Sequence, residues 1–276
     1  APRRALASWR WLLARRLTQA LVLAAFLSGP WWGVWILKGN LAASRLFDFL
    51  PLTDPFAFLQ TLASGHRPAA DALLGVALVT GFYALIGGRV FCAWVCPMNV
   101  VTDSAAWLRR RLGLRGGHAP HAATRYWLAG ALLVATAITG MQVWEWLNPV
   151  SMLQRGLIFG AGLGWLLVAG VFLYDLLLAG RGWCGRLCPM GAIYAWTGRR
   201  GLVHVSAARR EACNDCMDCF AVCPEPQVIR PALKPRAGEA GHPYILDGAC
   251  TRCARCLDVC DQKVFRLTGR SRRSEK

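Results

Sequence analysis

Cysteine is the residue type in this sequence whose number and spacing could do the most chemistry. The chain has 276 residues and 12 cysteines, and eight of the cysteines lie in two runs after about residue 205. The runs read "CNDCMDCFAVCPEP" and "CTRCARCLDVC", and both contain the spacing C-x₂-C-x₂-C-x₃-C. Thiolates are soft ligands that favour iron–sulfur clusters, zinc or copper(I). The tail of the chain is therefore expected to hold metal.

The spacing of these runs is typical of bacterial ferredoxins with two [4Fe–4S] clusters, in which the fourth cysteine of each run ligates the other cluster. Three thiolates wrap one cubane, and the fourth, after a helical step, points to the second. Zinc ribbons and disulfides are the alternatives; two full matched runs disfavour zinc, and a reducing compartment disfavours disulfides. We therefore predict an electron relay. The expected ligands are Cys213, Cys216, Cys219 and Cys260 for the first cluster site, and Cys250, Cys253, Cys256 and Cys223 for the second.

The other four cysteines lie in a motif that occurs twice. Residues 89–100 read "RVFCAWVCPMNV" and residues 181–192 read "RGWCGRLCPMGA". On an α-helix, Cys-x₃-Cys places two thiols on one face, and nearby arginines would lower their pKa. Buried inert cysteine, a dithiol relay, zinc and copper(I) are alternatives to a third iron–sulfur centre. We expect a further metal or iron–sulfur site formed by Cys92, Cys96, Cys184 and Cys188, flanked by Arg89, Arg181 and Arg186.

Apolar stretches of the length that spans a membrane must position these motifs. They cover roughly 17–37, 72–88, 126–147 and 157–179, and nearly lack ionisable residues, which disfavours a soluble helical core. The first stretch is too long for a typical cleaved signal peptide, so we expect it to be retained.

The basic residues predict how these spans are oriented. Of the 32 Lys and Arg residues, 28 lie before residue 17, within 89–125 or after residue 180. The positive-inside rule then places both termini in the cytoplasm and exports the loops at 38–71 and 148–156. Topology explains the net charge of +17, so no nucleic-acid partner is expected.

Both copies of the Cys-x₃-Cys-Pro motif end a span, and these two spans run in the same direction. All four cysteines are therefore expected at the cytoplasmic edge of the membrane, beside the tail. The shared pattern suggests a duplicated pair of spans. The predicted fold class is an all-α membrane domain of four transmembrane helices at 1–204, followed by an α+β two-cluster ferredoxin domain at 205–276.

The residues that are absent restrict the electron donor. None of the five histidines lies inside an apolar stretch and the sequence has no C-x-x-C-H, so no haem is expected. A lipid-soluble quinol is then the natural donor, and its site needs a polar group near a membrane interface. The candidates are Glu145 and Asp54 on the exported side and Asp175 on the cytoplasmic side.

The whole chain resembles the ferredoxin-type membrane subunits of the periplasmic nitrate reductase system, the NapH family. The resemblance rests on "FLSGPWWGVWILKGN", "FDFLPLTDPFAFLQTLASGH", "FCAWVCPMN", "WEWLNPVSM", "GWCGRLCPMGA" and "CMDCFAVCPEP". It implies a quinol dehydrogenase of the bacterial inner membrane that passes electrons to a periplasmic iron–sulfur partner, NapG, and on to nitrate reductase. It also implies that the eight tail cysteines ligate clusters and that the other four form a paired motif at the membrane edge.

Related ferredoxins of methylamine utilisation, nitrous oxide reduction and oxidase assembly share the cysteine pattern, but we expect them to diverge from "PLTDPFAFLQTLASGH". The predicted topology also puts the clusters in the cytoplasm, whereas the family's acceptor is periplasmic. Two other functions fit the residues. One is an iron–sulfur assembly or metal-reducing factor that acts at the Cys-x₃-Cys-Pro motifs, and the other is a structural anchor for a soluble partner.

Overall fold

The computed structural model describes residues 9–114, 116–160, 162–235 and 242–269, and they form two compact units. The tail unit contains 9–18, Tyr83–Val95 and the described residues from Tyr194 onward. The helical unit contains Gln19–Phe82 and the described residues of Cys96–Ile193. The tail unit thus begins before the predicted boundary at 204/205 and takes in two earlier segments, one of which carries Cys92.

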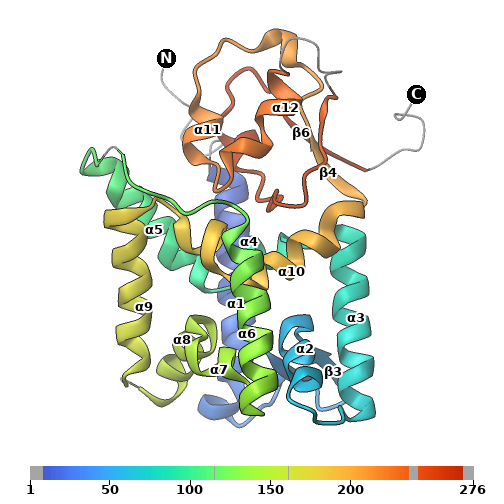
Figure 1. Cartoon of the computed structure of the whole chain (residues 1–276). Helices are drawn as coiled ribbons and strands as arrows, with labels where there is room; N and C mark the ends of the chain where they lie inside the picture. Colours follow the sequence, from blue (N-terminus) through green and yellow to red (C-terminus); the bar gives the residue numbers. More distant parts are fainter. Residues whose placement is uncertain (1–8, 115, 161, 236–241, 270–276) are drawn as a thin grey trace. The chain divides into compact units, whose positions relative to one another are not determined.

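The helical unit is built mainly from helices. Its long helices α3, α6 and α9 follow one common direction, and the short helices α2, α7 and α8 lie towards one end of them (Figure 1). Three helices have residues in both units: α1, α3 and α10. The helices are α1 (Arg10–Trp32), α2 (Pro55–Ala63), α3 (Ala70–Ile86), α5 (Met98–Arg111), α6 (Thr124–Thr139), α7 (Val143–Leu147), α8 (Pro149–Phe159), α9 (Gly164–Leu173), the π-helices η2 (Tyr174–Leu178) and η3 (Trp183–Leu187), and α10 (Pro189–Thr197).

The helix bounds differ from the predicted apolar spans. Helix α6 ends at Thr139, where Gly140 adopts a left-handed conformation with φ of 67°, so the predicted span 126–147 is divided. The predicted span 157–179 is also divided, because α8 ends at Phe159 and α9 begins at Gly164. Within the described residues, α1 is the helix long and apolar enough to cross a membrane, and α3 and Gly164–Leu178 are shorter apolar helices.

A small antiparallel sheet lies in the segment that the all-α prediction left without strands. Its strands are β1 (Leu37–Gly39), β2 (Ala43–Leu46) and β3 (Leu50–Thr53), in the order β1-β2-β3. The Asn40 side chain closes the first turn by accepting hydrogen bonds from two following backbone amides at 2.9 and 2.8 Å. Phe47 and Asp48, with φ of 50° and 61°, form the second turn. Positive φ at both turn residues matches the twist of an antiparallel hairpin.

The same local sequence device begins a short helix in each half of the helical unit. Asp54 caps α2 by accepting from the amides of Phe56 and Ala57, with Pro55 at the first helical position. Asn148 caps α8 in the same way, with Pro149 after it. A capping side chain followed by proline satisfies free amides and presets φ. In each half the capped helix is followed by an apolar helix and then by a Cys-x₃-Cys-Pro motif, as a duplicated pair would require.

The tail unit is an α+β structure whose sheet has the order β5-β4-β6, all antiparallel. Helices α11 and α13 pack against each other and carry cysteines of the two runs. Its core includes Val205, Ile229 and Phe265. The elements are α4 (Val90–Trp94), η4 (Gly198–Arg200), β4 (Val203–Ser206), η5 (Arg210–Ala212), α11 (Asp218–Val222), η6 (Pro226–Val228), α12 (Arg230–Leu233), β5 (Tyr244–Ile245), α13 (Arg255–Val259) and β6 (Arg266–Gly269).

Candidate iron–sulfur sites

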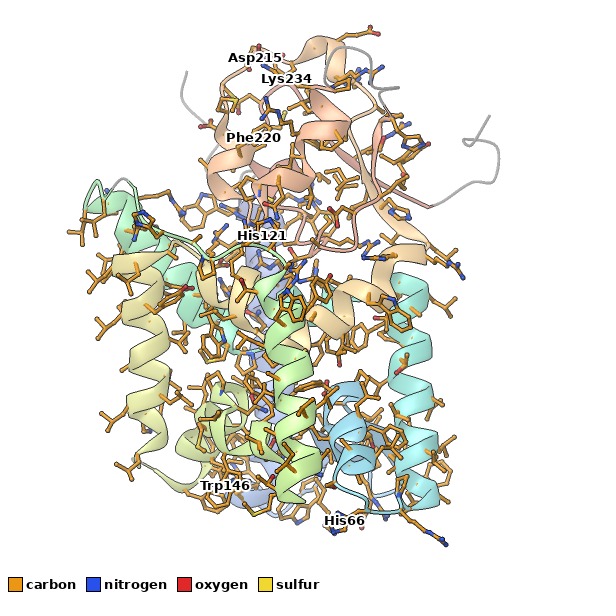
Figure 2. All side chains as sticks on the ribbon, in the orientation of Figure 1. His66, His121, Trp146, Asp215, Phe220 and Lys234 are labelled. Carbon is orange, nitrogen blue, oxygen red and sulfur yellow. The ribbon has the colours of Figure 1, made fainter. Side chains whose placement is uncertain are left out.

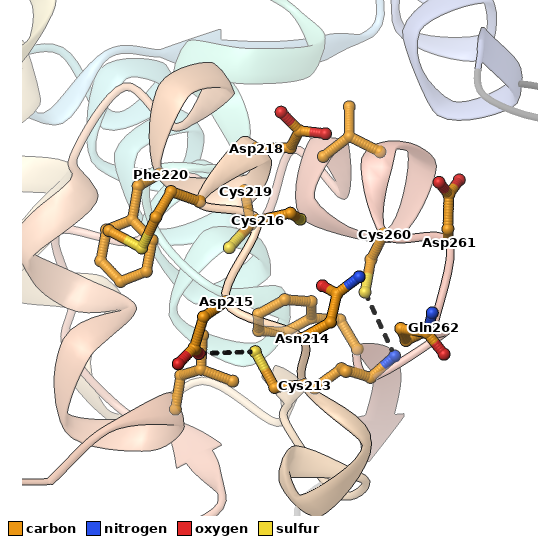
Figure 3. Close-up of a pocket in the computed structure, with 15 residues that line it drawn as sticks. Cys213, Asn214, Asp215, Cys216, Asp218, Cys219, Phe220, Cys260, Asp261 and Gln262 are labelled. Atoms are coloured by element: carbon orange, nitrogen blue, oxygen red, sulfur yellow. Dashed lines mark hydrogen bonds between the residues drawn. The ribbon is translucent and has the colours of Figure 1, made fainter. Parts of the chain in front are cut away.

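The first cavity of the tail unit brings together cysteines from both runs. It has a volume of about 60 Å³, and its lining includes Cys213, Cys216, Cys219 and Cys260 (Figure 3). The first three come from one run and the fourth from the end of the other. Met217, Phe220, Val259 and Phe265 supply apolar walls. The residues predicted for the first cluster site therefore surround one space.

The second cavity contains the other four tail cysteines. It has a volume of about 20 Å³, and its lining includes Cys223, Cys250, Cys253 and Cys256. Cys219 and Cys223 are four residues apart, yet they line different cavities. The reason is that Cys219 lies on α11, whereas Cys223 follows it in extended conformation with ψ of 132°.

The two cysteine runs share a backbone pattern that explains how they curl. In the first run Asp215 and Met217 have positive φ, and in the second run Arg252 and Ala254 occupy the same positions with positive φ. Non-glycine residues are uncommon in this region, and such strain tends to occur at functional sites. Residues with positive φ alternate with the cysteines, so the backbone of each run curls around its cavity and directs successive thiols towards that cavity. The two runs are therefore equivalent loops.

Burial controls the chemistry of the thiols. It raises the pKa of Cys219 and of Cys250 to about 11, and it raises the pKa of Cys256 well above the usual value of a thiol. Metal ligation removes a proton from each thiol, so loading of these cavities releases protons.

Among the residues that the structure describes, no three His, Cys, Asp or Glu side chains gather closely enough for a single metal ion. A cubane differs because its four thiolates bind four separate irons. The residues present thus fit thiolate-ligated iron–sulfur clusters.

The first cavity is the more exposed of the two. Cys216 is exposed, whereas Cys250, Cys253 and Cys256 are buried. Asp215 at its rim forms an ion pair of 2.7 Å with Lys234, and both side chains are labelled in Figure 2. This pair and a hydrogen bond from the Cys213 thiol lower the pKa of Asp215. The first site is therefore the one that a soluble redox partner could approach.

Segments from far earlier in the chain contact the second cysteine run. The Asp258 carboxylate, two residues after Cys256, accepts the backbone N–H groups of Trp11 and Leu12 at 3.1 Å each. The Trp94 indole donates to the carbonyl of Arg252 at 3.3 Å. Asp258 thus satisfies free amides at the start of α1, and its negative charge favours that end of the helix.

The two copies of Cys-x₃-Cys-Pro have different backbones. In the first, Cys92 lies on α4, which ends at Trp94, so Cys96 lies beyond the helix. In the second, Cys184 lies on the π-helix η3, and the Cys188 amide donates to Trp183. The idea of two thiols on one α-helical face is therefore wrong for both copies. Cys92 belongs to the tail unit and the other three cysteines to the helical unit, and their action as one site stays a prediction.

Two of the arginines expected to favour thiolates are paired with carboxylates instead. Arg89 forms a fully buried ion pair of 2.5 Å with Glu225. Arg181 pairs with Asp103 at 3.1 Å. Cys184 has a polar neighbour in the Thr102 hydroxyl, 3.7 Å from its sulfur.

The three carboxylates proposed for a quinol site lie in different settings. Asp54 is buried as the cap of α2. Glu145 is about one-fifth exposed and approaches Arg155 at 3.8 Å and the amides of Asn40 and Asn148 at 3.5 Å. Asp175 is fully buried on η2, where one oxygen accepts from the Trp183 amide at 2.9 Å and the other has no hydrogen-bond partner among the residues that the structure describes.

Sequence reasoning missed the polar residues that support the second site. Glu225 and Asp258 lie two residues after Cys223 and Cys256 respectively, and both are buried. A carboxylate that close to a predicted ligand was a detectable signal. Its partners, Arg89 and the start of α1, were not detectable, because they lie more than a hundred residues away.

Comparison with known proteins agrees with these features. The profile of a family described as "4Fe-4S binding domain" matches residues 69–115 and 161–206, which contain the two Cys-x₃-Cys-Pro motifs. The chain is 51% identical to the ferredoxin-type protein NapH of Escherichia coli, over 95% of this chain and 91% of that protein. No solved structure matches significantly.

Proteins of methylamine utilisation are similar to the same degree. The chain is 49% identical to the methylamine utilization ferredoxin-type protein MauN of Methylorubrum extorquens, over 95% of this chain and 90% of that protein. For MauN of Paracoccus denitrificans the identity is 51%, over 97% and 93%. With two cysteine-lined cavities and relatives of this similarity along nearly its whole length, the chain belongs to the NapH-type family of ferredoxin-type iron–sulfur proteins.

Proposed function

We propose that this protein is a membrane electron-transfer subunit that oxidises quinol and passes electrons through iron–sulfur clusters to a periplasmic iron–sulfur partner, NapG, and on to periplasmic nitrate reductase. One observation carries the proposal. Eight cysteines from two runs divide four and four between two cavities of one compact unit. Membership of the NapH-type family supports the same function.

In this proposal each cavity holds one [4Fe–4S] cluster, ligated as the ferredoxin pattern predicts. Such clusters accept and donate one electron each. The chain supplies thiolates, buries the second site and leaves Cys216 exposed at the first. The first site is therefore accessible to solvent and the second is enclosed, and in this proposal electrons reach the periplasmic partner through the membrane segments of the same chain.

The surface of the helical unit supports a position within the membrane. Large apolar side chains are exposed along its long helices, for example Leu74 on α3, Ile138 on α6 and Leu166 on α9. Polar side chains are buried inside, among them Gln60, which accepts from the Trp144 amide at 3.0 Å. In water this distribution would be unfavourable, whereas in lipid it is expected. We propose four spans in the bacterial inner membrane with both termini in the cytoplasm.

Quinol oxidation releases two electrons and two protons, so its site needs a proton acceptor. Asp54 is committed to capping α2, and its replacement should cost about 1 kcal/mol of stability. Glu145 and Asp175 remain as acceptors; Asp175 offers a buried oxygen that has no hydrogen-bond partner within the described part of the chain. Glu145→Gln and Asp175→Asn should each retain the clusters, and at least one of them should slow quinol oxidation by about tenfold or more.

The test is reduction of the clusters by a quinol analogue. The full chain, purified with its iron–sulfur partner, should show cluster bleaching on addition of a reduced quinol, at a rate that a quinone-site inhibitor suppresses. Dithionite serves as the control reductant. Clusters that respond to dithionite but never to quinol would contradict the proposal and would favour an assembly or metal-reducing factor.

Methylamine utilisation is the second candidate pathway, because MauN of Paracoccus denitrificans is as similar to this chain as NapH of Escherichia coli. The electron-transfer chemistry would be the same and the soluble partner different. Expression of this chain in strains that lack either relative distinguishes the two. Restored nitrate respiration supports the first candidate, and restored growth on methylamine the second.

The match of a 4Fe-4S family to both Cys-x₃-Cys-Pro repeats supports a further proposal, a third iron–sulfur or metal centre. Its ligands would be Cys92, Cys96, Cys184 and Cys188. Such a centre would connect quinol oxidation with the tail clusters.

A further inference from the structure

A buried arginine joins the first Cys-x₃-Cys-Pro segment to the second cluster site. Arg89 and Glu225 have side chains that are 0% and 1% exposed. The Arg89 guanidinium donates from Nη1 to Glu225 Oε1 at 2.5 Å and to the carbonyl of Ala249 at 2.8 Å. Both partners belong to the tail unit, as does Arg89.

The two partners flank cysteines from different runs. Glu225 lies two residues after Cys223, and Ala249 directly precedes Cys250. Glu225 lines the second cavity itself, and its other oxygen accepts from the Gln227 amide at 2.5 Å. One guanidinium therefore connects the two backbone segments whose cysteines line that cavity.

The equivalent arginine of the second motif does not share this role. Arg181 holds the same position in its motif as Arg89, but pairs with Asp103 in α5 of the helical unit. The repeat is thus symmetrical in sequence and asymmetrical in its contacts. Arg89 therefore interacts beyond its own Cys-x₃-Cys-Pro motif, because its partners lie in the ferredoxin part of the chain.

We propose that Arg89 is a positioning residue of the second cluster site: it holds the Cys223 and Cys250 segments in register and raises the reduction potential of the cluster bound there. This inference rests on the proposed ligand assignment. Reduction adds negative charge to a cluster, so a nearby cation favours the reduced form. A buried cation is screened much less than an exposed one. The negative charge of Glu225 has the opposite effect and lowers the reduction potential. The net effect of the pair on the potential is therefore the difference between the two contributions.

The experiment is a redox titration of the full-length protein, followed by electron paramagnetic resonance. Each variant is also made in a Cys219→Ala background, which leaves the second site as the remaining cluster site of the tail. Arg89→Gln should lower the potential of that site and Glu225→Gln should raise it. Each shift should be on the order of a tenfold change in the ratio of reduced to oxidised cluster, about 59 mV for one electron.

Two further variants separate charge from structure. Arg89→Lys keeps the charge and should stay near the wild-type potential. The double variant Arg89→Gln with Glu225→Gln removes both charges and should return close to it. Arg200→Gln is the matched control, because it removes the same charge from an exposed position of the same unit. The potential of the first site should be unchanged in all of them.

Shifts of the two single variants in the same direction, or equal shifts at both sites, would overturn the proposal, as would an Arg89→Gln shift no larger than that of Arg200→Gln. If Arg89→Gln does not accumulate as folded protein, Glu225→Gln decides, and a potential that fails to rise refutes the proposal. Titration with a chemical reductant keeps this result separate from quinol oxidation. A wild-type protein without a second cluster signal would instead refute the ligand assignment.

Discussion

Exchange of the fourth cysteine between the two runs gives the sharpest test of the tail. Cys219 and Cys223 are neighbours in sequence but line different cavities, whereas Cys219 and Cys260 are distant in sequence and line the same one. Loss of one ligand should disable one cluster. Each single Cys→Ala variant of a tail cysteine should therefore contain about four irons fewer than the wild type.

The iron content of double variants decides which cysteines share a cluster. Cys219→Ala with Cys260→Ala removes two ligands of one cavity, so the loss should again be about four irons. Cys219→Ala with Cys223→Ala removes one ligand from each cavity, so the loss should be about eight irons. Ligands of one centre act as a unit, and their effects are therefore not additive.

The assay is iron and sulfide content per folded chain, with the visible absorbance of the clusters as a second measure. Circular dichroism and gel filtration confirm that each variant is folded. If each cluster took its ligands from a single run, the two double variants would exchange their results. That outcome would refute cross-ligation and the reasoning from the cavities.

A fusion reporter at the C-terminus should indicate the cytoplasm and one in the 38–71 segment the exported side, given the uneven Lys and Arg distribution; an exported C-terminus would overturn the topology. In protein stripped of iron, Cys216 should be alkylated first at pH 8, because it is exposed, whereas the raised pKa of Cys219, about 11, leaves about a hundredfold less thiolate than an ordinary thiol. Mass spectrometry measures the order, and equal rates would contradict it. Any one Cys→Ser change at the Cys-x₃-Cys-Pro motifs should cost about as much quinol oxidation as changing all four, and wild-type protein should contain more metal than about eight irons. Independent, additive losses with no extra metal would leave these cysteines as helix-end packing.

The sequence alone determined the cysteine chemistry. The spacing of the two runs is a local property, because three thiols within seven residues can surround one cubane without help from distant segments. The grouping of Cys223 with the second run also followed from spacing, and the cavities have that same grouping. Capping pairs such as Asp54–Pro55 and the apolar character of α1, α3 and α9 are equally local.

Tertiary structure decided what depends on distant partners. In the sequence, Arg89 is a neighbour of Cys92. In the fold, its buried guanidinium pairs with Glu225, because a buried charge needs a partner of opposite charge. The π-helix at Cys184 and the division of the apolar stretches at Gly140 and Phe159 were likewise hidden, because composition reports apolar length and not the point where a helix ends. Spacing thus specified which atoms could bind iron, and packing specified which charges surround them.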